Sequence, residues 1–363
     1  MAMTWWRQPA EQARPHVRPA ALLAALLLGV SVLVPALVGG RHAAAADTDL
    51  GALKEAFKRP TKIPFPADNP YTDIKAKLGE MLFFDPRLSG DKNISCATCH
   101  IAGLAWTDAI KLSIGAGNRM MNKRSQTLLN LAWSELLMWD GRFPNLEEQI
   151  LGPLFKNDIM NNNRTAMIDE VTAIPAYRKL FEQAFPKEDI TVESIAKAIA
   201  TYERTIVSNK APFDRWVDGD DKAMTDSAKR GFALFNGRAN CVACHNSWRF
   251  TDDGFHDIGL DDDDPGRGRH VPDVPVLEHA FKTPTLRNVA QRPPYMHNGE
   301  VATLEEVIKH YAGGFKERES LSPEMKKFSA TPEEIQDLVA FMHALTSEDD
   351  PVQIPLLPVK EAM

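Results

Sequence analysis

The chain has 363 residues, of which 44% are hydrophobic and 25% are charged, a composition typical of a soluble globular protein with room for two domains. Its 49 acidic and 42 basic residues give a formal net charge of −7. A surface with this excess of acidic groups repels phosphate backbones, so we expect no nucleic-acid partner.

The first 46 residues differ in composition from the rest of the chain. Three arginines precede an apolar run over residues 20–38, and three consecutive alanines follow at 44–46. This is the pattern of a secretory signal peptide, so we expect export to the periplasm. The apolar run approaches the ~20 residues that a membrane-spanning helix needs, so membrane anchoring by an uncleaved leader is the alternative.

Residues 47–70 contain four prolines and predict an extended arm. A helical pattern over residues 71–84 then leads into a turn at Asp85–Gly90. Further along, Thr191 can cap a helix that runs to about Val207, with one apolar face.

Two copies of the motif C-x-x-C-H contain all four cysteines of the chain. Two cysteines three residues apart can form thioethers to one haem, and the next histidine then lies under the iron as its proximal ligand. Paired zinc-binding C-x-x-C motifs are usually about 15–20 residues apart, whereas 141 residues separate these pairs. Structural disulfides remain the other alternative. The motifs therefore predict two covalently bound haem c groups, attached at Cys96 and Cys99 with His100, and at Cys241 and Cys244 with His245.

Strand signals are few, so the fold class is expected to be mainly α, with one haem module in each half. The break at Ala211-Pro212 marks the expected domain boundary. The expected parts are a signal peptide (1–46), an arm (47–70), an N-terminal haem c domain (71–210), a C-terminal haem c domain (211–347) and a tail (348–363).

A capping box at Thr303–Glu306 predicts a helix that ends at Gly313-Gly314. On this helix Tyr311 shares a face with the apolar residues, whereas His310 points about 100° away. The apolar residues of that face are Leu304, Val307 and Ile308.

In their order and spacing, the motifs resemble those of the bacterial di-haem cytochrome c peroxidase and MauG superfamily. The resemblance covers nearly all of the chain after the leader, and it implies two cytochrome c-like helical domains, one haem each. It rests on Leu82–Ser89, both haem motifs, Met138–Arg142, Leu146–Gln149, Lys282–Val289 and Pro294–Gly299.

The resemblance also implies roles for individual residues. The haem of His100 is the one that meets hydrogen peroxide, and Trp139 relays electrons between the haems; a plain core aromatic is the alternative. Gln149 and Pro153 match positions on the peroxide side of the first haem, and His297 matches a residue beside the second haem and its propionates. Four other histidines are expected on the surface or in loops, namely His256, His270, His279 and His343.

Two departures from the family pattern point to the MauG-like branch. Members that need reductive activation have a ligating histidine in the segment S-I-G-H, but here that position is Ala116, so the first haem is expected to be open. Where many peroxidases place a methionine on the second haem, Tyr311 matches the tyrosine ligand of MauG-like members. A core tyrosine, or His310 as the ligand, is the alternative. A phenolate favours oxidised iron more than a thioether does.

Two further departures concern the first haem and a metal ion. A glutamate common on the peroxide side is replaced by Ile159, which leaves Asp158, or Gln149 with a water, as alternatives for moving the proton. The interdomain calcium of the family uses an asparagine, whose position here is Arg124. A guanidinium would repel Ca²⁺ and could replace it, so calcium is possible but doubtful.

These patterns together predict an exported di-haem c oxidoreductase that uses hydrogen peroxide and is MauG-like in its ligands. Its expected partner is an electron donor or protein substrate: a small c-type cytochrome, a cupredoxin or a protein side chain. One alternative is a cytochrome c peroxidase in which Met296 or Met325 ligates the second haem. Another is a non-catalytic di-haem electron-transfer cytochrome, in which both irons would be six-coordinate.

Overall fold

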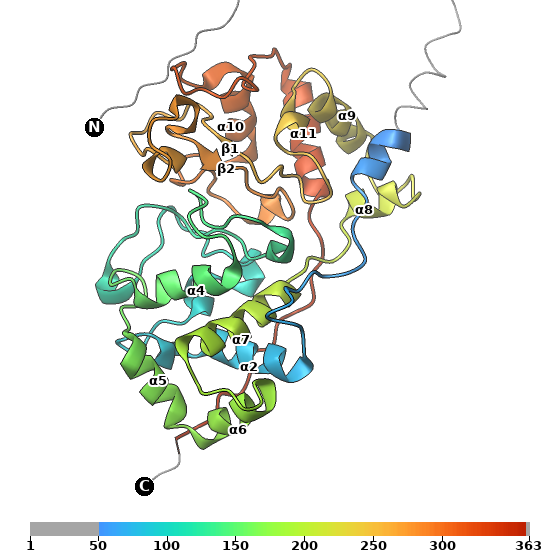
Figure 1. Cartoon of the computed structure of the whole chain (residues 1–363). Helices are drawn as coiled ribbons and strands as arrows, with labels where there is room; N and C mark the ends of the chain where they lie inside the picture. Colours follow the sequence, from blue (N-terminus) through green and yellow to red (C-terminus); the bar gives the residue numbers. More distant parts are fainter. Residues whose placement is uncertain (1–50, 361–363) are drawn as a thin grey trace, which may run out of the picture. The chain divides into compact units, whose positions relative to one another are not determined.

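The structure is a computed structural model and describes residues 51–360. The predicted signal peptide, residues 1–46, lies outside the described residues. Within the range that is described, no helix has both the length and the apolar character needed to cross a membrane. Helices dominate this part of the chain, so the prediction of a mainly α fold is confirmed (Figure 1).

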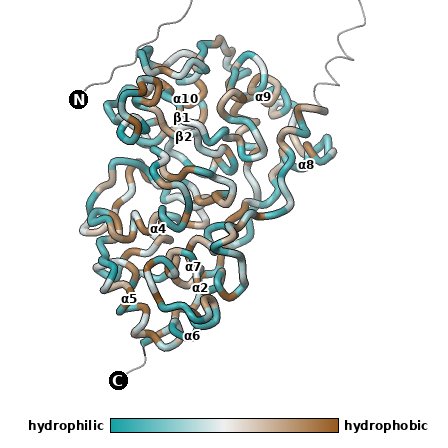
Figure 2. Tube along the Cα trace, in the orientation of Figure 1, coloured by the Kyte–Doolittle hydropathy of each residue, from teal (hydrophilic) through white to brown (hydrophobic). Residues whose placement is uncertain are grey.

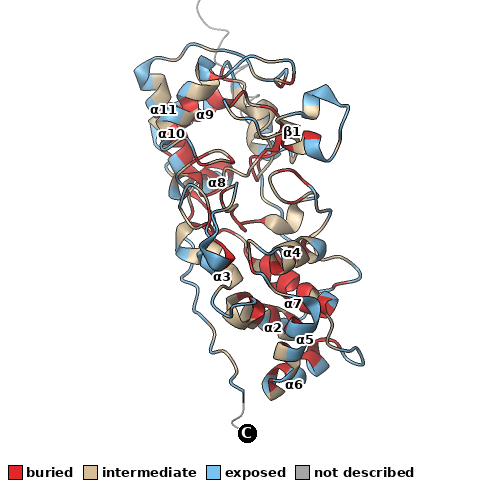
Figure 3. Ribbon diagram, turned by 90° about the vertical axis from the view of Figure 1, so that its left-hand side faces the viewer, coloured by how far each residue is buried: buried red, intermediate tan, exposed pale blue. Residues whose placement is uncertain are grey.

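The helices of the N-terminal domain are α2 (Asp73–Phe84), α3 (Cys96–Cys99), α4 (Leu146–Phe155), α5 (Arg164–Thr172), α6 (Pro175–Ala184) and α7 (Val192–Thr205). Helices α2 and α7 form its centre and pack directly on each other. Threonine hydroxyls cap both helices, at Thr72 and Thr191. At Gly79 a Cβ atom would lie 1.9 Å from the carbonyl oxygen of Ala198, so only glycine allows this close approach. Polar and apolar residues alternate along α7 (Figure 2), which is largely buried (Figure 3).

The C-terminal domain repeats this arrangement with α8 (Pro212–Val217), α9 (Asp226–Asn236), α10 (Leu304–Lys309) and α11 (Pro332–Ala344). Helices α9 and α11 are its central pair. At Gly231 a Cβ atom would lie 1.9 Å from the carbonyl oxygen of Asp337. Each half of the chain is thus built on one helix pair that a single glycine brings into contact.

Short elements connect these helices. Two strands, β1 (Phe255–His256) and β2 (Phe281–Lys282), pair antiparallel, with Phe255 opposite Lys282. The 3₁₀ turns are η1 (Pro86–Leu88), η2 (Ala102–Leu104), η3 (Ala116–Asn118), η4 (Leu131–Trp133), η5 (Cys241–Ala243), η6 (Arg267–Arg269), η7 (Pro275–Leu277) and η8 (Val289–Gln291). A π-helical turn, η9 (His310–Gly314), follows α10 directly, so the predicted helix changes its winding at the residue before Tyr311.

Each end of the described chain extends beyond its neighbouring domain and contacts the other one. Residues 51–56, in the arm expected to be extended, are helical, and Phe57 is 1% exposed within the core of the C-terminal domain. Its ring stacks on Phe250, with the centroids 4.9 Å apart. The tail runs the other way, where Arg87 of the N-terminal domain donates to the carbonyl oxygen of Pro358 at 2.8 Å. Each terminal segment therefore stabilises the domain at the opposite end of the sequence.

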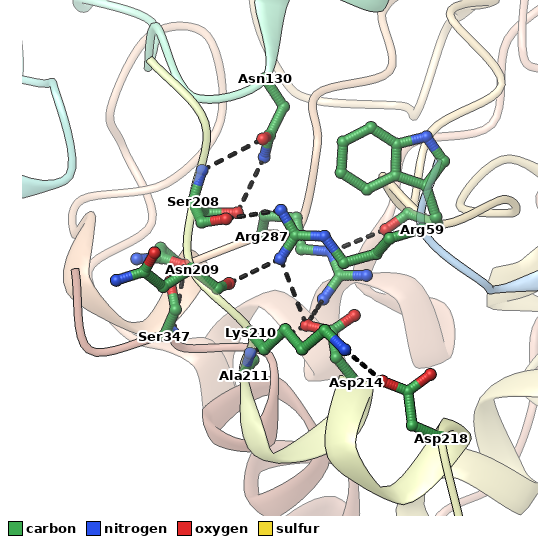
Figure 4. Close-up of polar contacts among 12 residues, drawn as sticks. Arg59, Asn130, Ser208, Asn209, Lys210, Ala211, Asp214, Asp218, Arg287 and Ser347 are labelled. Atoms are coloured by element: carbon green, nitrogen blue, oxygen red, sulfur yellow. Dashed lines mark hydrogen bonds and ion pairs between the residues drawn. The ribbon is translucent and has the colours of Figure 1, made fainter. Parts of the chain in front are cut away.

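A buried polar network holds the segment between α7 and α8 (Figure 4). Arg287 of the C-terminal domain, 1% exposed, pairs with Asp214 at 2.8 Å. Arg59 of the arm donates to the backbone carbonyls of Ser208 and Asn209. Asn130 of the N-terminal domain exchanges two hydrogen bonds with Ser208. Because the arm and both domains bind this linker, its backbone is held in one conformation.

The position of Phe57 predicts that the arm is part of the C-terminal core. Phe57→Ala should lower the free energy of unfolding by about 3–5 kcal/mol, because it deletes a fully buried ring. Urea unfolding of the holoprotein, followed by the haem absorbance and by circular dichroism, measures this loss. Phe65→Ala is the matched control, since the Phe65 ring packs mainly on the exposed Tyr71. Equal losses in the two variants would show that the arm is not part of the core.

Candidate di-haem site

The first C-x-x-C-H motif forms one helical turn, α3, with its histidine held in a defined orientation. The backbone N–H of His100 donates to the carbonyl oxygen of Cys96 at 3.0 Å. The Nδ1 atom of His100 lies 3.1 Å from the carbonyl oxygen of Trp106 and 3.2 Å from Oγ of Ser125. A donated Nδ1–H leaves Nε2 as the free ligand atom, as in metal-bound histidines. Burial lowers the pKa of His100, which favours the neutral ring that a metal requires.

The second motif repeats this geometry. His245 donates its backbone N–H to the carbonyl oxygen of Cys241 at 2.9 Å, and its Nδ1 lies 2.9 Å from the carbonyl oxygen of Phe250. Burial also lowers the pKa of His245. In both motifs, the ring is oriented by a carbonyl five or six residues further along the chain.

The cysteines of both motifs are free of disulfides. Burial raises the pKa of the Cys99 thiol to about 11 and that of the Cys241 thiol to about 12. Thiols in such surroundings stay protonated when no metal ion is bound. Each motif thus presents two cysteines without a disulfide beside a neutral imidazole with a free Nε2, and these groups fit the covalent attachment of haem c.

One large cavity joins the second motif to the domain interface. Its lining includes Cys241, Cys244 and His245 of the second motif, Leu304, Val307, Ile308 and Tyr311 of α10 and η9, and Arg124, Trp139, Arg292 and His297 at the interface. Met296 and Met325 also line it. The apolar face predicted for residues 304–311 therefore faces this cavity.

Tyr311 and His310 are separated by the geometry of the π-helical turn. His310 donates from Nε2 to the carbonyl oxygen of Ile258 at 2.8 Å and does not line the cavity. Tyr311 lines the cavity, and burial raises the pKa of its phenol, as do the nearby thiols of Cys244 and Cys241. A π-helical turn often occurs at a functional site, because it redirects one side chain out of the helical register. The protein surroundings alone keep the phenol protonated, so only a bound cation would favour its phenolate.

Trp139 lies where the cavity meets the N-terminal domain. Its indole N–H donates to the carbonyl oxygen of Arg124 at 3.0 Å, and its ring centroid lies 6.3 Å from that of His297. His297 is 4% exposed, stacks on Phe281 and has Nε2 3.1 Å from a carboxylate oxygen of Asp262. The structure therefore brings Trp139 and His297 together at the wall of the cavity that contains the second motif.

Ala116 occupies a buried and tightly held position. Its N–H donates to the carbonyl oxygen of Ile159 at 2.8 Å. At the preceding Gly115, a Cβ atom would lie 2.0 Å from the carbonyl oxygen of Asp158. The two loops that carry Ala116 and Ile159 are thus paired through their backbones. Asp158 forms an ion pair with Lys156 at 3.1 Å.

Gln149 and Pro153 lie four residues apart in α4, so they share one face of that helix. Pro153 has no backbone N–H and cannot donate to the carbonyl of Gln149. The side-chain amide of Gln149 lies 3.5 Å from the sulfur of Met138, next to Trp139. The structure therefore groups these two predicted residues on one helix face, and their roles stay predictions.

Sequence reasoning missed three residues near the two motifs. Glu203 of α7 is 4% exposed, one of its oxygens lacks a partner, and burial raises its pKa to about 8. His256, expected on the surface or in a loop, is half-buried in β1, lies 2.9 Å from Asp252 and has its pKa raised to about 10, chiefly by that hydrogen bond. The spacing of four residues between Asp252 and His256 was a usable signal. Arg292, 8% exposed, is the third, and no sequence pattern marks its burial.

Comparison with known proteins agrees with this geometry. The model of the family "Di-haem cytochrome c peroxidase" matches residues 73–222, and that of "Cytochrome c" matches residues 228–346. The chain is 46% identical over 317 residues to the methylamine utilization protein MauG of Methylorubrum extorquens, covering 86% of this chain and 90% of that protein. It is 48% identical over 308 residues to MauG of Methylophilus methylotrophus, covering 84% and 92%.

Among solved structures, the crystal structure of a MauG-like protein associated with microbial copper homeostasis superposes with a TM-score of 0.74. The two chains are 32% identical, and the match covers 80% of this chain and 95% of the other. The prediction of two cytochrome c-like domains is confirmed by the family matches. The chain belongs to the di-haem cytochrome c peroxidase and MauG family and is a di-haem oxidoreductase of the peroxidase type.

Proposed function

We propose that this protein is a periplasmic, MauG-like di-haem enzyme that reacts with hydrogen peroxide at an open first haem and passes oxidising equivalents through Trp139 to a second haem. The observation that carries this proposal is the position of Tyr311, which a π-helical turn presents to the cavity shared with the second C-x-x-C-H motif. When bound, the haem groups supply the irons that react with peroxide and store oxidising equivalents.

At the first haem, His100 would provide the proximal ligand, because its Nδ1 is engaged by the Trp106 carbonyl and Nε2 is free. Ala116 offers no competing ligand atom. Gln149 and Pro153 would line the peroxide side, with the Gln149 amide holding a water that moves the proton. Ile159 supplies no carboxylate for this step, so we infer that proton transfer there is slower than in members with an acid.

Between the haems, the Trp139 indole would carry electrons. Its N–H donates to a backbone carbonyl, so the ring is fixed at the cavity wall beside His297. A fixed ring needs little reorganisation when it gains or loses an electron. His297 would contact the second haem at its propionate side.

At the second haem, His245 and Tyr311 would hold the iron. A phenolate favours oxidised iron, so Tyr311 as a ligand would suit storage of an oxidising equivalent better than uptake of electrons from a small cytochrome. The second candidate function, a cytochrome c peroxidase, is favoured by one observation: Met296 and Met325 line the same cavity. A non-catalytic electron-transfer cytochrome is less compatible with Ala116, which leaves the first iron open.

The oxidising equivalents would leave the protein through a redox partner. We propose a small c-type cytochrome, a cupredoxin or a protein side chain as the electron donor, reached in the periplasm after export by the leader. The chain is similar to MauG proteins named for methylamine utilization. That similarity, at 46–48% identity, supports a MauG-like use of the oxidising equivalents.

Ala116 predicts that the oxidised protein binds cyanide and reacts with peroxide without prior reduction. Ala116→His should restore a competitor for the iron and slow both reactions by roughly tenfold or more, because only the fraction with the histidine displaced can react. Stopped-flow spectroscopy of the fully oxidised protein measures this change, with Ala116→Gly as the control. Peroxide reactivity that appears only after one-electron reduction would contradict an open first site.

Trp139→Phe should keep the fold, since most of the ring volume is retained. Electron transfer between the haems should slow by roughly tenfold or more, which corresponds to about 1.4 kcal/mol in the barrier. Single-turnover kinetics after one equivalent of peroxide give this rate. Trp216→Phe is the control, because Trp216 is buried in the C-terminal core and does not line the cavity. If transfer is unchanged in Trp139→Phe, the indole is not the relay.

Tyr311→Met should raise the midpoint potential of the second haem by on the order of hundreds of millivolts, since axial ligands set haem potentials over about 0.8 V. Tyr311→Phe should leave that haem five-coordinate or water-bound. Spectroelectrochemistry reads both results. Tyr295→Met is the matched control, because Tyr295 also lines the cavity but is bonded to the Val289 carbonyl. A thioether ligand in the wild-type spectrum, or equal potentials in wild type and Tyr311→Met, would favour the peroxidase alternative.

A further inference from the structure

Two buried arginines from different domains meet at the wall of the cavity. Arg124 of the N-terminal domain is 7% exposed, and Arg292 of the C-terminal domain is 8% exposed. The guanidinium of Arg124 donates from Nη1 to the carbonyl oxygen of Arg292 at 3.0 Å. The backbone N–H of Arg124 donates to the carbonyl oxygen of His297, and its own carbonyl accepts the Trp139 indole N–H. Arg124 therefore binds both domains and the predicted relay residue.

Neither guanidinium forms an ion pair with a carboxylate within residues 51–360. Arg292 donates only to backbone carbonyls, those of Thr285, Arg287 and Asn288. On Arg124, the Nε and Nη2 atoms are buried without a partner. Burial lowers the pKa of both groups, and the charge of Arg124 helps to lower that of Arg292 to about 9. Two buried cations with unused donors destabilise the fold unless an anion binds them.

The cavity itself identifies the anion that fits. Arg124 and Arg292 line it together with His245 and Tyr311 of the second haem site. A haem group carries two propionate carboxylates, and a carboxylate accepts charge-assisted hydrogen bonds from a guanidinium. Haem carboxylates at this wall would satisfy the free N–H groups of Arg124 and neutralise both arginines.

The same residues do not fit a calcium ion. Ca²⁺ takes about 6–8 oxygen ligands at roughly 2.3–2.6 Å. Here the carbonyl oxygen of Arg292 already accepts from a guanidinium, and two positive charges lie beside it. Repulsion between a divalent cation and a guanidinium is strong in a buried site.

We propose that Arg124 is an internal cation that replaces a metal ion between the haem domains and, with Arg292, binds haem propionates. Because the charge belongs to the chain, chelators cannot remove it, and the interface is calcium-independent. Through its carbonyl, Arg124 also positions the Trp139 indole. This inference rests on the haem groups of the family and not on the reaction with peroxide.

The test uses the holoprotein with both haems after treatment with EGTA. We expect no Ca²⁺ binding at millimolar concentration in isothermal titration calorimetry. The midpoint potentials of both haems should be the same in EGTA and in CaCl₂. Saturable binding of one Ca²⁺, with potentials that shift on chelation, would overturn the proposal whatever the variants do.

Variants at Arg124 then test its charge directly. Arg124→Gln should lower the midpoint potential of the adjacent haem, because loss of a buried positive charge favours oxidised iron, and Arg124→Lys should restore most of the wild-type potential. Arg119→Gln is the matched control, since Arg119 is exposed in the same loop and bonds only the Asn157 carbonyl. An Arg124→Gln potential equal to that of wild type would show that the guanidinium does not face a haem carboxylate.

Discussion

The hydrogen bond from Nδ1 of each motif histidine to a backbone carbonyl is the interaction on which the two sites depend. It lies at 3.1 Å for His100 and 2.9 Å for His245. Each bond fixes the tautomer and the ring plane, so that Nε2 is the only free ligand atom. The accepting carbonyls, of Trp106 and Phe250, follow the motifs in loops whose side chains enter the two cores. Folding of each core therefore orients its histidine, and the halves share this design although their loops differ.

Local features of the sequence predicted much of the fold. The threonine caps at Thr191 and Thr303 and the C-x-x-C-H spacing depend only on neighbouring residues, so these helix starts and the motif geometry follow from short stretches. The glycine contacts at Gly79 and Gly231 could not be predicted, because they depend on a second helix more than 100 residues away. The same holds for Phe57, whose arm reads as extended but completes a distant core.

Sequence reasoning identified candidate site residues whose role follows from their own chemistry, such as metal-ligating side chains. It missed residues whose role depends on burial by other parts of the chain. Tyr311 and His310 could be separated by helix periodicity, but the π-helical turn that presents Tyr311 could not be predicted. Glu203 follows a buried tyrosine in an amphipathic helix, and a glutamate there reads as solvent-exposed. Its burial arises because α7 packs against both α2 and α4, which lie in separate segments of the sequence.

The buried arginines of the described chain are of two kinds: those paired with a carboxylate of the chain, and those with only backbone carbonyls as partners. We infer that the first kind stabilises the fold and the second binds the cofactor. Arg287 pairs with Asp214 at 2.8 Å, and the Trp248 carbonyl accepts its Nε–H, so its charge is neutralised by the chain. Arg124 and Arg292 are also buried but have only carbonyls as partners. Because the chain supplies a carboxylate to Arg287, it could equally supply one to Arg124 and Arg292. The lack of such a partner within the part of the chain that the structure describes indicates that a bound group uses their charge. Arg124 and Arg292 lie on the cavity wall, whereas Arg287 lies in the linker network outside it. Of the buried arginines in residues 51–360, the two that lack a carboxylate partner thus both line a cavity with space for an anionic cofactor.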